Sequence, residues 1–416
     1  MGKMIEIKEQ EERVILAAVS TSDGDDVNAS VDELEELVNT AGAVVAGRLI
    51  QKRENIHPGT YLGKGKIEEL KELIWECQAT GVVCDDELSP AQLKNLEEAL
   101  ETKVMDRTMV ILDIFASRAR TREGKIQVEL AQLRYRAARL VGMRDSLSRL
   151  GGGIGTRGPG EKKLETDRRL IHSRIGQLKA ELEDVKRHRD VVRSRREQGR
   201  VLTAALVGYT NAGKSTLLNR LTQAGVLAED KLFATLDTTT RTLSLPGGET
   251  VLLTDTVGFI RKLPHHLIEA FRSTLQEARY CDVIVHVVDC ANPQMDMQMH
   301  VVYETLRQLG IQDKEIVTAF NKIDKEEADS SVRDTVSDYR VKLSAKTGEG
   351  IDLLFDVFGQ ILRKRRIYFE KQFSYQEAGR IERIRKYGQI LEERYEADGI
   401  YVKAYVPVEV FGELYQ

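Results

Sequence analysis

The strongest constraint on the fold of this chain is a glycine-rich segment, Gly208-Tyr-Thr-Asn-Ala-Gly-Lys-Ser215. An apolar, strand-like run over 201–207 precedes it, and 216–219 is typical of the start of a helix. In this context the segment is a P-loop, whose backbone N–H groups and helix N-terminus surround a phosphate. We expect Lys214 to contact the β- and γ-phosphates of a nucleotide and the Ser215 hydroxyl to bind Mg²⁺. The segment therefore predicts an α/β domain with a mostly parallel sheet and helices on both faces.

A second string, Asn321-Lys-Ile-Asp324, predicts which base the nucleotide carries. The Asp324 carboxylate can accept hydrogen bonds from the guanine N1–H and 2-amino groups, and adenine offers no such pair. Each string can occur by chance, but together and in this order they indicate a GTP site. Further along, Ser344-Ala-Lys346 follows a short apolar run and precedes Gly348-Glu-Gly350. We expect its backbone N–H groups to contact the guanine O6.

Between these strings, an apolar run over 251–254 ends at Asp255-Thr-Val-Gly258. A carboxylate at the end of such a strand holds the metal in P-loop proteins, here through a water, and the Gly258 N–H is expected to contact the γ-phosphate. Many GTPases place a glutamine directly after this glycine to orient the attacking water. Here that position is Phe259, which cannot hydrogen-bond water. Intrinsic hydrolysis should therefore be slow, and a partner is implied.

The first switch is predicted within Phe233-Ala-Thr-Leu-Asp237, where Thr235 is favoured over the threonines at 238–240 as a Mg²⁺ ligand. The predicted catalytic residues are Lys214, Thr235 and Gly258, and the predicted Mg²⁺ ligands are Ser215 and Thr235, with Asp255 acting through a water. The residues predicted to bind GTP are Gly208, Tyr209, Thr210, Asn211, Ala212, Gly213, Lys214, Ser215, Thr216, Phe233, Ala234, Thr235, Leu236, Asp237, Asp255, Thr256, Val257, Gly258, Asn321, Lys322, Ile323, Asp324, Ser344, Ala345 and Lys346.

Composition excludes several classes of protein. A hydrophobic fraction of 41% and a charged fraction of 31% are typical of a globular protein. No apolar run approaches the ~20 residues of a membrane-spanning helix, and the acidic N-terminus is not typical of a signal peptide. The cysteines form neither a CxxC pair nor a zinc spacing, as expected of a reduced protein; they are Cys77, Cys84, Cys281 and Cys290. We therefore expect a cytoplasmic protein without a membrane span.

Charge is distributed unevenly along the chain, whose formal net charge is -4. From Ser117 to Arg200 there are 23 Lys and Arg residues against 11 Asp and Glu residues, so this block carries +12 and the remainder carries -16. A basic block inside an acidic protein is typical of a chain that binds a polyanion. The alternative is that the block is a solvated helical face.

The basic block is predicted to form a helical hairpin. Apolar residues recur at near-helical spacing over 123–141 and again over 162–196, which indicates two long amphipathic helices. The connection over 148–160 is rich in glycine, which precludes regular structure and lets backbone approach a partner closely. The alternative is an ordinary loop. The candidate RNA-binding residues are Arg149, Gly151, Gly152, Gly153, Arg157, Lys162 and Lys163.

Four domains are predicted: an α/β domain over 1–117, the helical hairpin over 118–198, the P-loop domain over 199–366, and a small α+β domain over 367–416 that contains a strand over 400–406. The later strands expected in the P-loop domain are 283–289, 316–320 and 339–343, and its later helices are 267–278, 297–309 and 351–362.

The first predicted domain alternates strand-like and helical runs. The predicted strands are 14–19, 43–49, 81–84 and 110–114, and the predicted helices are 31–38, 66–75 and 90–100. Gly63-Lys-Gly-Lys66 fits either an anion site or the plain start of a helix. Asp85-Asp86-Glu87 is interpreted as the cap of the following helix rather than as a metal site.

Several strings of this chain resemble those of the HflX family of ribosome-associated GTPases, and together they extend over nearly the whole chain. They are Tyr61-Leu-Gly-Lys-Gly-Lys66, Asp106-Arg-Thr-Met-Val-Ile-Leu-Asp113, Ala119-Arg-Thr-Arg-Glu-Gly-Lys125, Gln127-Val-Glu-Leu-Ala-Gln-Leu133, Gly151-Gly-Gly-Ile-Gly-Thr-Arg-Gly-Pro-Gly160, Leu164-Glu-Thr-Asp-Arg-Arg169 and Asp255-Thr-Val-Gly-Phe-Ile-Arg261. The family's first-switch string also matches Phe-Ala-Thr-Leu-Asp here and supports Thr235. One departure is Thr238, where the family usually has proline.

The resemblance implies that the protein binds the large ribosomal subunit and its rRNA, and that ribosomes stimulate its GTP hydrolysis. It also implies action on stalled or idle ribosomes under stress, including dissociation of the subunits. Family members are further reported to hydrolyse ATP through the N-terminal part, for which Lys64 and Lys66 are the candidates here. We expect a monomer that binds neither DNA nor a membrane.

Two other functional classes stay open on the residues alone. A metabolic kinase or ATPase would not need Asn321 and Asp324, so selectivity for GTP over ATP distinguishes it. A switch GTPase with a protein or membrane partner and no RNA would explain Phe259 but would leave the basic block without a role. Co-sedimentation with ribosomes across a salt series distinguishes that class.

Overall fold

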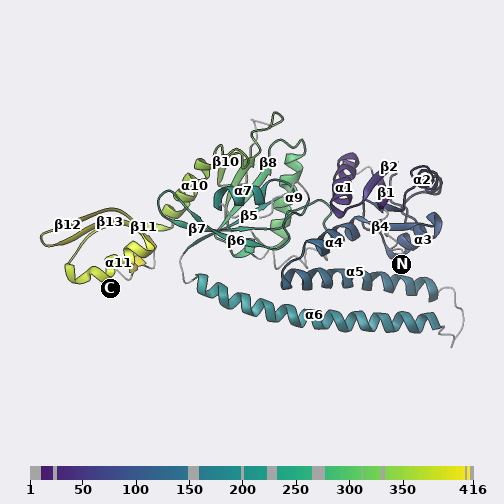
Figure 1. The fold of residues 1–416 in the computed structure, drawn as a ribbon, viewed down its shortest axis with the longest axis horizontal. Helices are drawn as coiled ribbons and strands as arrows, with labels where there is room; N and C mark the ends of the chain where they lie inside the picture. The colour runs from purple at the N-terminus through teal and green to yellow at the C-terminus, as the bar shows by residue number, and fades with distance from the viewer. Residues whose placement is uncertain are drawn as a thin grey trace, which may run out of the picture. The chain divides into compact units, whose positions relative to one another are not determined.

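The computed structural model describes residues 11–21, 26–148, 159–197, 201–222, 232–264, 277–311, 313–328, 333–407 and 410–412. The chain forms two compact units. Its helices and strands are labelled in Figure 1. The first unit is Met1–Lys186 together with Asp230–Asp237 and Arg261–Arg272. The second is Arg187–Glu229, Thr238–Ile260 and Ser273–Gln416. The described helices include none that is long and apolar enough to cross a membrane.

The first unit is built on a four-stranded parallel sheet with the order β2-β1-β3-β4. Its strands are β1 (Arg13–Ser20), β2 (Val44–Lys52), β3 (Gly81–Cys84) and β4 (Lys103–Asp106). Its helices are α1 (Val27–Ala41), α2 (Lys64–Glu76), α3 (Pro90–Leu100) and α4 (Arg107–Arg118). Residues of the strands and of α2 and α3 form one apolar core that includes Ile15, Leu70, Val82 and Leu96. The predicted strand–helix alternation is therefore confirmed.

One predicted strand, 110–114, is wrong, because these residues belong to α4. The strand of this region is β4, which ends at Asp106. The Asp106 side chain accepts a hydrogen bond from Met109 N at 2.9 Å, so the same carboxylate caps the helix that follows. Most of the apolar run is buried on several sides of α4. A helix buried in this way shows no amphipathic spacing, and its sequence resembles that of a buried strand.

The interpretation of Asp85-Asp86-Glu87 as a helix cap is also wrong. The cap of α3 is Ser89, whose hydroxyl accepts from Gln92 N at 3.2 Å while Gln92 Oε1 accepts from Ser89 N at 3.0 Å. Pro90 occupies the first helical position, where its missing N–H costs nothing. The two aspartates instead take part in a network of ion pairs described below.

The helices α5 (Arg122–Ser148) and α6 (Pro159–Glu197) confirm the two predicted long helices (Figure 1). Their apolar faces pack through Ile126, Leu130, Ile175 and Leu178. Ion pairs join Arg174 to Glu129 at 2.8 Å and Arg122 to Glu181 at 3.8 Å, so positions rise along one helix as they fall along the other. The helices are therefore antiparallel. Of the candidate RNA-binding residues, Arg149, Gly151, Gly152, Gly153 and Arg157 lie outside the described residues, as do the side chains of Lys162 and Lys163.

The second unit contains a six-stranded sheet with the order β10-β9-β8-β5-β7-β6. Its strands are β5 (Leu202–Gly208), β6 (Thr239–Ser244), β7 (Thr250–Asp255), β8 (Val283–Asp289), β9 (Glu315–Asn321) and β10 (Tyr339–Lys342). All neighbours pair in parallel except β6, an antiparallel edge strand on β7. The predicted mostly parallel sheet is confirmed.

Helices cover both faces of this sheet. Those described are α7 (Lys214–Thr222), α9 (Met295–Gln308) and α10 (Ile351–Lys364). Val287 packs in one core with Leu218 of α7 and Phe358 of α10. The next residue, Val288, packs in another core with Met299 of α9. Successive strand residues point to opposite faces, so α9 lies on the face opposite to α7 and α10. The predicted helix over 267–278 lies mostly outside the described residues.

The C-terminal part forms a small α+β fold with its own sheet, as predicted. Its elements are β11 (Arg366–Phe373), the short 3₁₀ helix η1 (Tyr375–Glu377), α11 (Ala378–Tyr387), β12 (Gln389–Glu396) and β13 (Gly399–Pro407). The strands pair antiparallel in the order β11-β13-β12. Phe373, Ile384 and Val402 share an apolar core between this sheet and α11.

Candidate nucleotide-binding site

The P-loop lies between β5 and α7 in the second unit, as the sequence predicts. Its glycines are required by close approaches of neighbouring atoms. A Cβ at Gly208 would lie 2.3 Å from the Val287 carbonyl oxygen, and a Cβ at Gly213, where φ is +95°, would lie 2.3 Å from Asn321 Nδ2. Glycine is required at 208 by a neighbouring backbone atom and at 213 by the left-handed φ together with the Asn321 side chain.

Lys214 lies buried beneath the loop. Its Nζ donates hydrogen bonds to the carbonyl oxygens of Gly208 at 3.1 Å and Tyr209 at 2.7 Å. Burial lowers the pKa of Lys214 to about 8, although the Asp255 carboxylate partly opposes this shift. A phosphate brought to the loop would supply negative charge that favours the ammonium form.

Ser215 and Asp255 bring two hard oxygen donors together. The Ser215 hydroxyl donates to Asp255 Oδ2 at 2.7 Å, and Asp255 is fully buried at the end of β7. Thr256 Oγ1 donates to the Leu206 carbonyl oxygen at 2.7 Å, which fixes the backbone directly after this carboxylate. Hydroxyl and carboxylate oxygens are the ligands that Mg²⁺ prefers, so these side chains fit that ion. The described residues contain no group of three His, Cys, Asp or Glu that could hold a metal, so phosphate or water oxygens would complete its coordination.

Asn321 connects the P-loop to the loop over 344–346. Its Nδ2 donates to the Ala212 carbonyl oxygen at 2.8 Å, and its Oδ1 accepts from Ala345 N at 2.9 Å. Lys322 reinforces the first link, since its Nζ donates to the Asn211 carbonyl oxygen at 2.8 Å and pairs with Asp289 at 2.6 Å. The predicted phosphate-binding and base-binding strings therefore contact one another directly.

The Asp324 carboxylate is exposed next to this link. Its Oδ1 accepts a hydrogen bond from Ser344 Oγ at 2.6 Å. That bond lowers the pKa of Asp324 below its ordinary value, so the group is an ionised acceptor at neutral pH. Sequence reasoning missed this contact between Asp324 and Ser344, although both strings were identified.

The segment 255–258 is packed against the P-loop. Phe259 N donates to the Gly208 carbonyl oxygen at 3.0 Å, and its carbonyl oxygen accepts from Thr210 N at 2.7 Å. A Cβ at Gly258 would lie 2.9 Å from Thr210 Cα and 3.1 Å from Lys214 Nζ. The Phe259 side chain is itself buried, 2% exposed.

The predicted first switch is grouped differently from the rest of the predicted site, because Phe233, Ala234, Thr235, Leu236 and Asp237 belong to the first unit. Asp237 Oδ2 accepts from Arg120 N at 2.8 Å and Thr121 N at 2.9 Å, and Thr121 Oγ1 donates to Asp237 Oδ1. Phe233 packs edge-to-face on Phe115 with ring centroids 4.7 Å apart. No signal in the sequence indicated these contacts.

Three family models match successive parts of the chain. They describe a GTP-binding GTPase N-terminal domain over 28–116, a GTP-binding GTPase middle region over 118–196, and a 50S ribosome-binding GTPase over 203–322. The chain is 73% identical over 414 residues to a protein named GTPase HflX from Lacrimispora saccharolytica, and the match covers 100% of this chain and 98% of that protein. The chain belongs to the HflX GTPase family. The resemblance drawn from the sequence strings is therefore confirmed, and the protein is a GTPase.

Other HflX proteins and one solved structure are similar over most of the chain. GTPase HflX from Caldanaerobacter subterraneus subsp. tengcongensis is 48% identical over 407 residues, which covers 98% of this chain and 94% of that protein. A GTP-binding protein from Sulfolobus solfataricus, solved in complex with GDP, is 24% identical, with a TM-score of 0.43 and coverage of 83% of this chain and 97% of that chain.

Proposed function

We propose that this HflX protein binds GTP and Mg²⁺ at its P-loop and hydrolyses GTP in response to the large ribosomal subunit. The observation that carries the nucleotide site is the set of direct contacts among four loops, 208–216, 255–258, 321–324 and 344–346. The partner is inferred from the 50S ribosome-binding family description and from the +12 block over 117–200.

The P-loop holds the phosphates in this proposal. Backbone N–H groups of 211–215 surround the β-phosphate, with the N-terminus of α7 behind them. Lys214 is already held beneath the loop by two carbonyl oxygens, so its ammonium group is placed before the nucleotide arrives. Gly258 N–H contacts the γ-phosphate and so responds to its loss. GDP leaves this last contact unmade.

Ser215 and Thr235 are the proposed direct ligands of Mg²⁺, and Asp255 acts through a water. When bound, the ion neutralises charge that develops on the β- and γ-phosphate oxygens. The 2.7 Å bond between Ser215 and Asp255 supports two of these assignments, because it places both oxygens at one point. The Thr235 assignment rests on the family string alone.

Base selection is assigned to Asp324. Its ionised carboxylate accepts the two guanine donors, and Ser344 holds it in position. Asn321 links this region to the P-loop and thereby sets the distance between base and phosphates. A purine without this donor pair would leave the carboxylate without these hydrogen bonds and would therefore bind more weakly.

Hydrolysis is proposed to depend on the ribosome. Phe259 has no group that could orient water, and its backbone is bonded to Gly208 and Thr210. The protein alone should therefore turn over slowly until the large subunit organises the catalytic water. Dissociation of stalled or idle ribosomes under stress is the proposed outcome, carried out in the cytoplasm by a monomer. An ATPase activity of the N-terminal part stays a prediction.

The decisive experiment measures GTP turnover with and without purified large subunits. Stimulation of at least about tenfold is expected, since a group supplied in trans accelerates other GTPases by more than this. Lys364→Ala is a control variant, because this lysine has a 63% exposed side chain, and its contacts with Glu315 at 3.7 Å and with the Tyr339 ring at 4.8 Å lie outside the proposed nucleotide site. Rapid turnover without ribosomes, or no stimulation by them, would contradict the proposal and favour a GTPase with a protein or membrane partner.

A further inference from the structure

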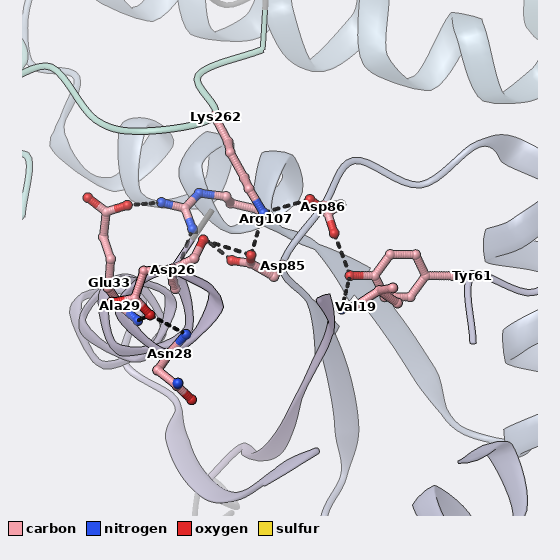
Figure 2. A network of polar contacts seen from close by, with 11 residues as sticks. Val19, Asp26, Asn28, Ala29, Glu33, Tyr61, Asp85, Asp86, Arg107 and Lys262 are labelled. Carbon is pink, nitrogen blue, oxygen red and sulfur yellow. Dashed lines mark hydrogen bonds and ion pairs between the residues drawn. The ribbon is translucent and has the colours of Figure 1, made fainter. Parts of the chain in front are cut away.

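Lys262, four residues after Gly258, is bound by two carboxylates of the first unit. Its Nζ donates to Asp85 Oδ2 at 2.6 Å and to Asp86 Oδ1 at 2.7 Å (Figure 2). Both aspartates directly follow β3. The Lys262 side chain is 28% exposed and that of Asp85 is 1% exposed, so this contact is shielded from water on one side.

The two carboxylates are part of a larger network in the first unit. Asp85 also accepts from Arg107 Nη1 at 2.9 Å and from Ser30 Oγ at 2.7 Å, and Arg107 pairs with Glu33. Burial raises the pKa of Asp85, but Arg107 and Lys262 outweigh it and hold the pKa below its ordinary value.

Asp86 is held on its other side by the sheet. Tyr61 Oη donates to Asp86 Oδ2 at 2.6 Å and accepts from Val19 N at 3.2 Å (Figure 2). Among the described charged side chains of the network, three carboxylates face two cations, Arg107 and Lys262. Removing Lys262 would leave one cation for three carboxylates, which is unfavourable in a largely buried place.

The backbone of Lys262 gives a second, independent observation. Its φ is +50°, a left-handed conformation that a non-glycine residue rarely adopts. Phe233, in the predicted first switch, has φ of +54° and is fixed against Phe115. Strained conformations of this kind persist where surrounding contacts hold them, and they gather at switch regions.

Backbone connectivity joins Lys262 to the nucleotide site. Two residues separate Lys262 from Phe259, whose carbonyl oxygen accepts a hydrogen bond from Thr210 N. Gly258 packs so closely that a Cβ there would lie 2.9 Å from Thr210 Cα. A γ-phosphate that binds the Gly258 N–H and draws it toward the nucleotide would move this segment away from Thr210. Such a displacement would pull on Lys262.

We propose that Asp85 and Asp86 form a latch for Lys262 that opposes the GTP-bound arrangement of the segment 255–262. The proposal rests on the GTP site described above. GTP must break the latch, so part of its binding free energy is used there, whereas GDP leaves the latch intact. Reciprocally, loss of the latch favours GTP over GDP. Lys262 is thus a positioning residue rather than a catalytic one.

The test measures the affinities of fluorescent GDP and of a non-hydrolysable fluorescent GTP analogue. Lys262→Ala and Asp86→Asn should each raise the affinity ratio of GTP analogue to GDP by at least roughly fivefold, the lower end of typical coupling between sites. Asparagine keeps an acceptor for Tyr61 Oη, so the fold of the sheet is spared. The double variant should equal Lys262→Ala, because in this proposal Asp86 acts on the segment through Lys262.

Two variants serve as controls. Lys262→Arg retains a cation and should keep the ratio within about twofold of the wild type. Lys71→Ala removes a lysine of α2 that is 41% exposed and pairs with Glu68 at 3.1 Å, and it should leave the ratio unchanged. Thermal unfolding of every variant measures the purely structural effect.

Unchanged ratios in both single variants would overturn the latch, whatever their thermal stability. Independent effects that multiply in the double variant would overturn it as well. Failure of the GTP site itself gives a different result, in which the wild type binds neither nucleotide and Lys214→Ala makes no difference. In that case hydrogen exchange of the peptides that contain Asp86 and Lys262 decides, since the latch predicts that Lys262→Ala exposes both and Lys71→Ala neither.

Discussion

Replacing Asp324 with asparagine tests the base assignment at a single functional group. Asparagine has nearly the same shape and keeps an oxygen that can accept the Ser344 hydroxyl, now 2.6 Å from Asp324 Oδ1. The change therefore leaves the loop supported while it replaces one acceptor by an amide donor. That donor faces the guanine amino group but matches the O2 atom of xanthine. GTP binding should weaken and binding of xanthosine triphosphate should improve.

The magnitude follows from the number and kind of bonds lost. The substitution affects two hydrogen bonds to an ionised carboxylate, and the solvent exposure of Asp324 reduces the free energy that each contributes. A total of about 2–3 kcal/mol is expected. At about 1.4 kcal/mol per tenfold, GTP affinity should fall by roughly 30- to 150-fold.

Equilibrium titration with fluorescent GTP and xanthosine triphosphate measures both affinities on one preparation. The Lys364→Ala variant should bind GTP as the wild type does, because this residue is distant from Asp324 in the chain and lies at the end of α10. If Asp324→Asn kept wild-type GTP affinity, guanine would have to be recognised elsewhere, and the assignment of the base-binding loops would be wrong.

Three further outcomes are expected. Lys214→Ala should abolish GTP turnover, with and without ribosomes, by removing the charge that compensates the phosphates. Burial lowers the pKa of Lys214 to about 8, below the 10.5 of an ordinary lysine, so GTP affinity should fall as pH rises above about 8. The free energy of unfolding should rise between those two pKa values, because there the unfolded chain binds a proton that the folded chain has lost. Nucleotide titrations and thermal unfolding from pH 7 to 10 check both signs. Alanine at Arg149, Arg157, Lys162 and Lys163 together should flatten the salt dependence of ribosome co-sedimentation by up to about four log–log units while GTP affinity stays constant. An unchanged slope would favour the alternative interpretation, in which the basic block is a solvated helical face.

The parts of the fold that the sequence predicts well are those where local chemistry leaves few choices. The glycines of the P-loop are required by atoms 2.3 Å from a Cβ at Gly208 and Gly213, so the motif itself implies the strand–loop–helix geometry. The central strands β5 and β8 are mostly apolar, with one polar residue inside each, Thr203 and His286, and their observed bounds agree with the predicted ones to within a residue. Local pattern and tertiary position agree at these places.

The failures occur where tertiary contacts decide. Residues 110–114 form a helix because they are buried on several sides, which removes the periodicity that identifies a helix. Asp85 and Asp86 resemble a helix cap, but their partner, Lys262, is more than 170 positions away. The contact of Asp237 with Thr121 likewise joins distant segments, and no local pattern could reveal it.

The antiparallel pair α5 and α6 is a mechanical lever as well as a basic surface. At ~1.5 Å per residue, the 27 residues of α5 extend for about 40 Å. Asp237 of the predicted first switch is bonded to Arg120 and Thr121, directly before the first turn of α5. A rotation of about 5° at that base would carry the opposite end of α5 through roughly 3.5 Å. A small rotation at the first switch would thus reach the far end of the hairpin as a shift of about the thickness of a nucleobase.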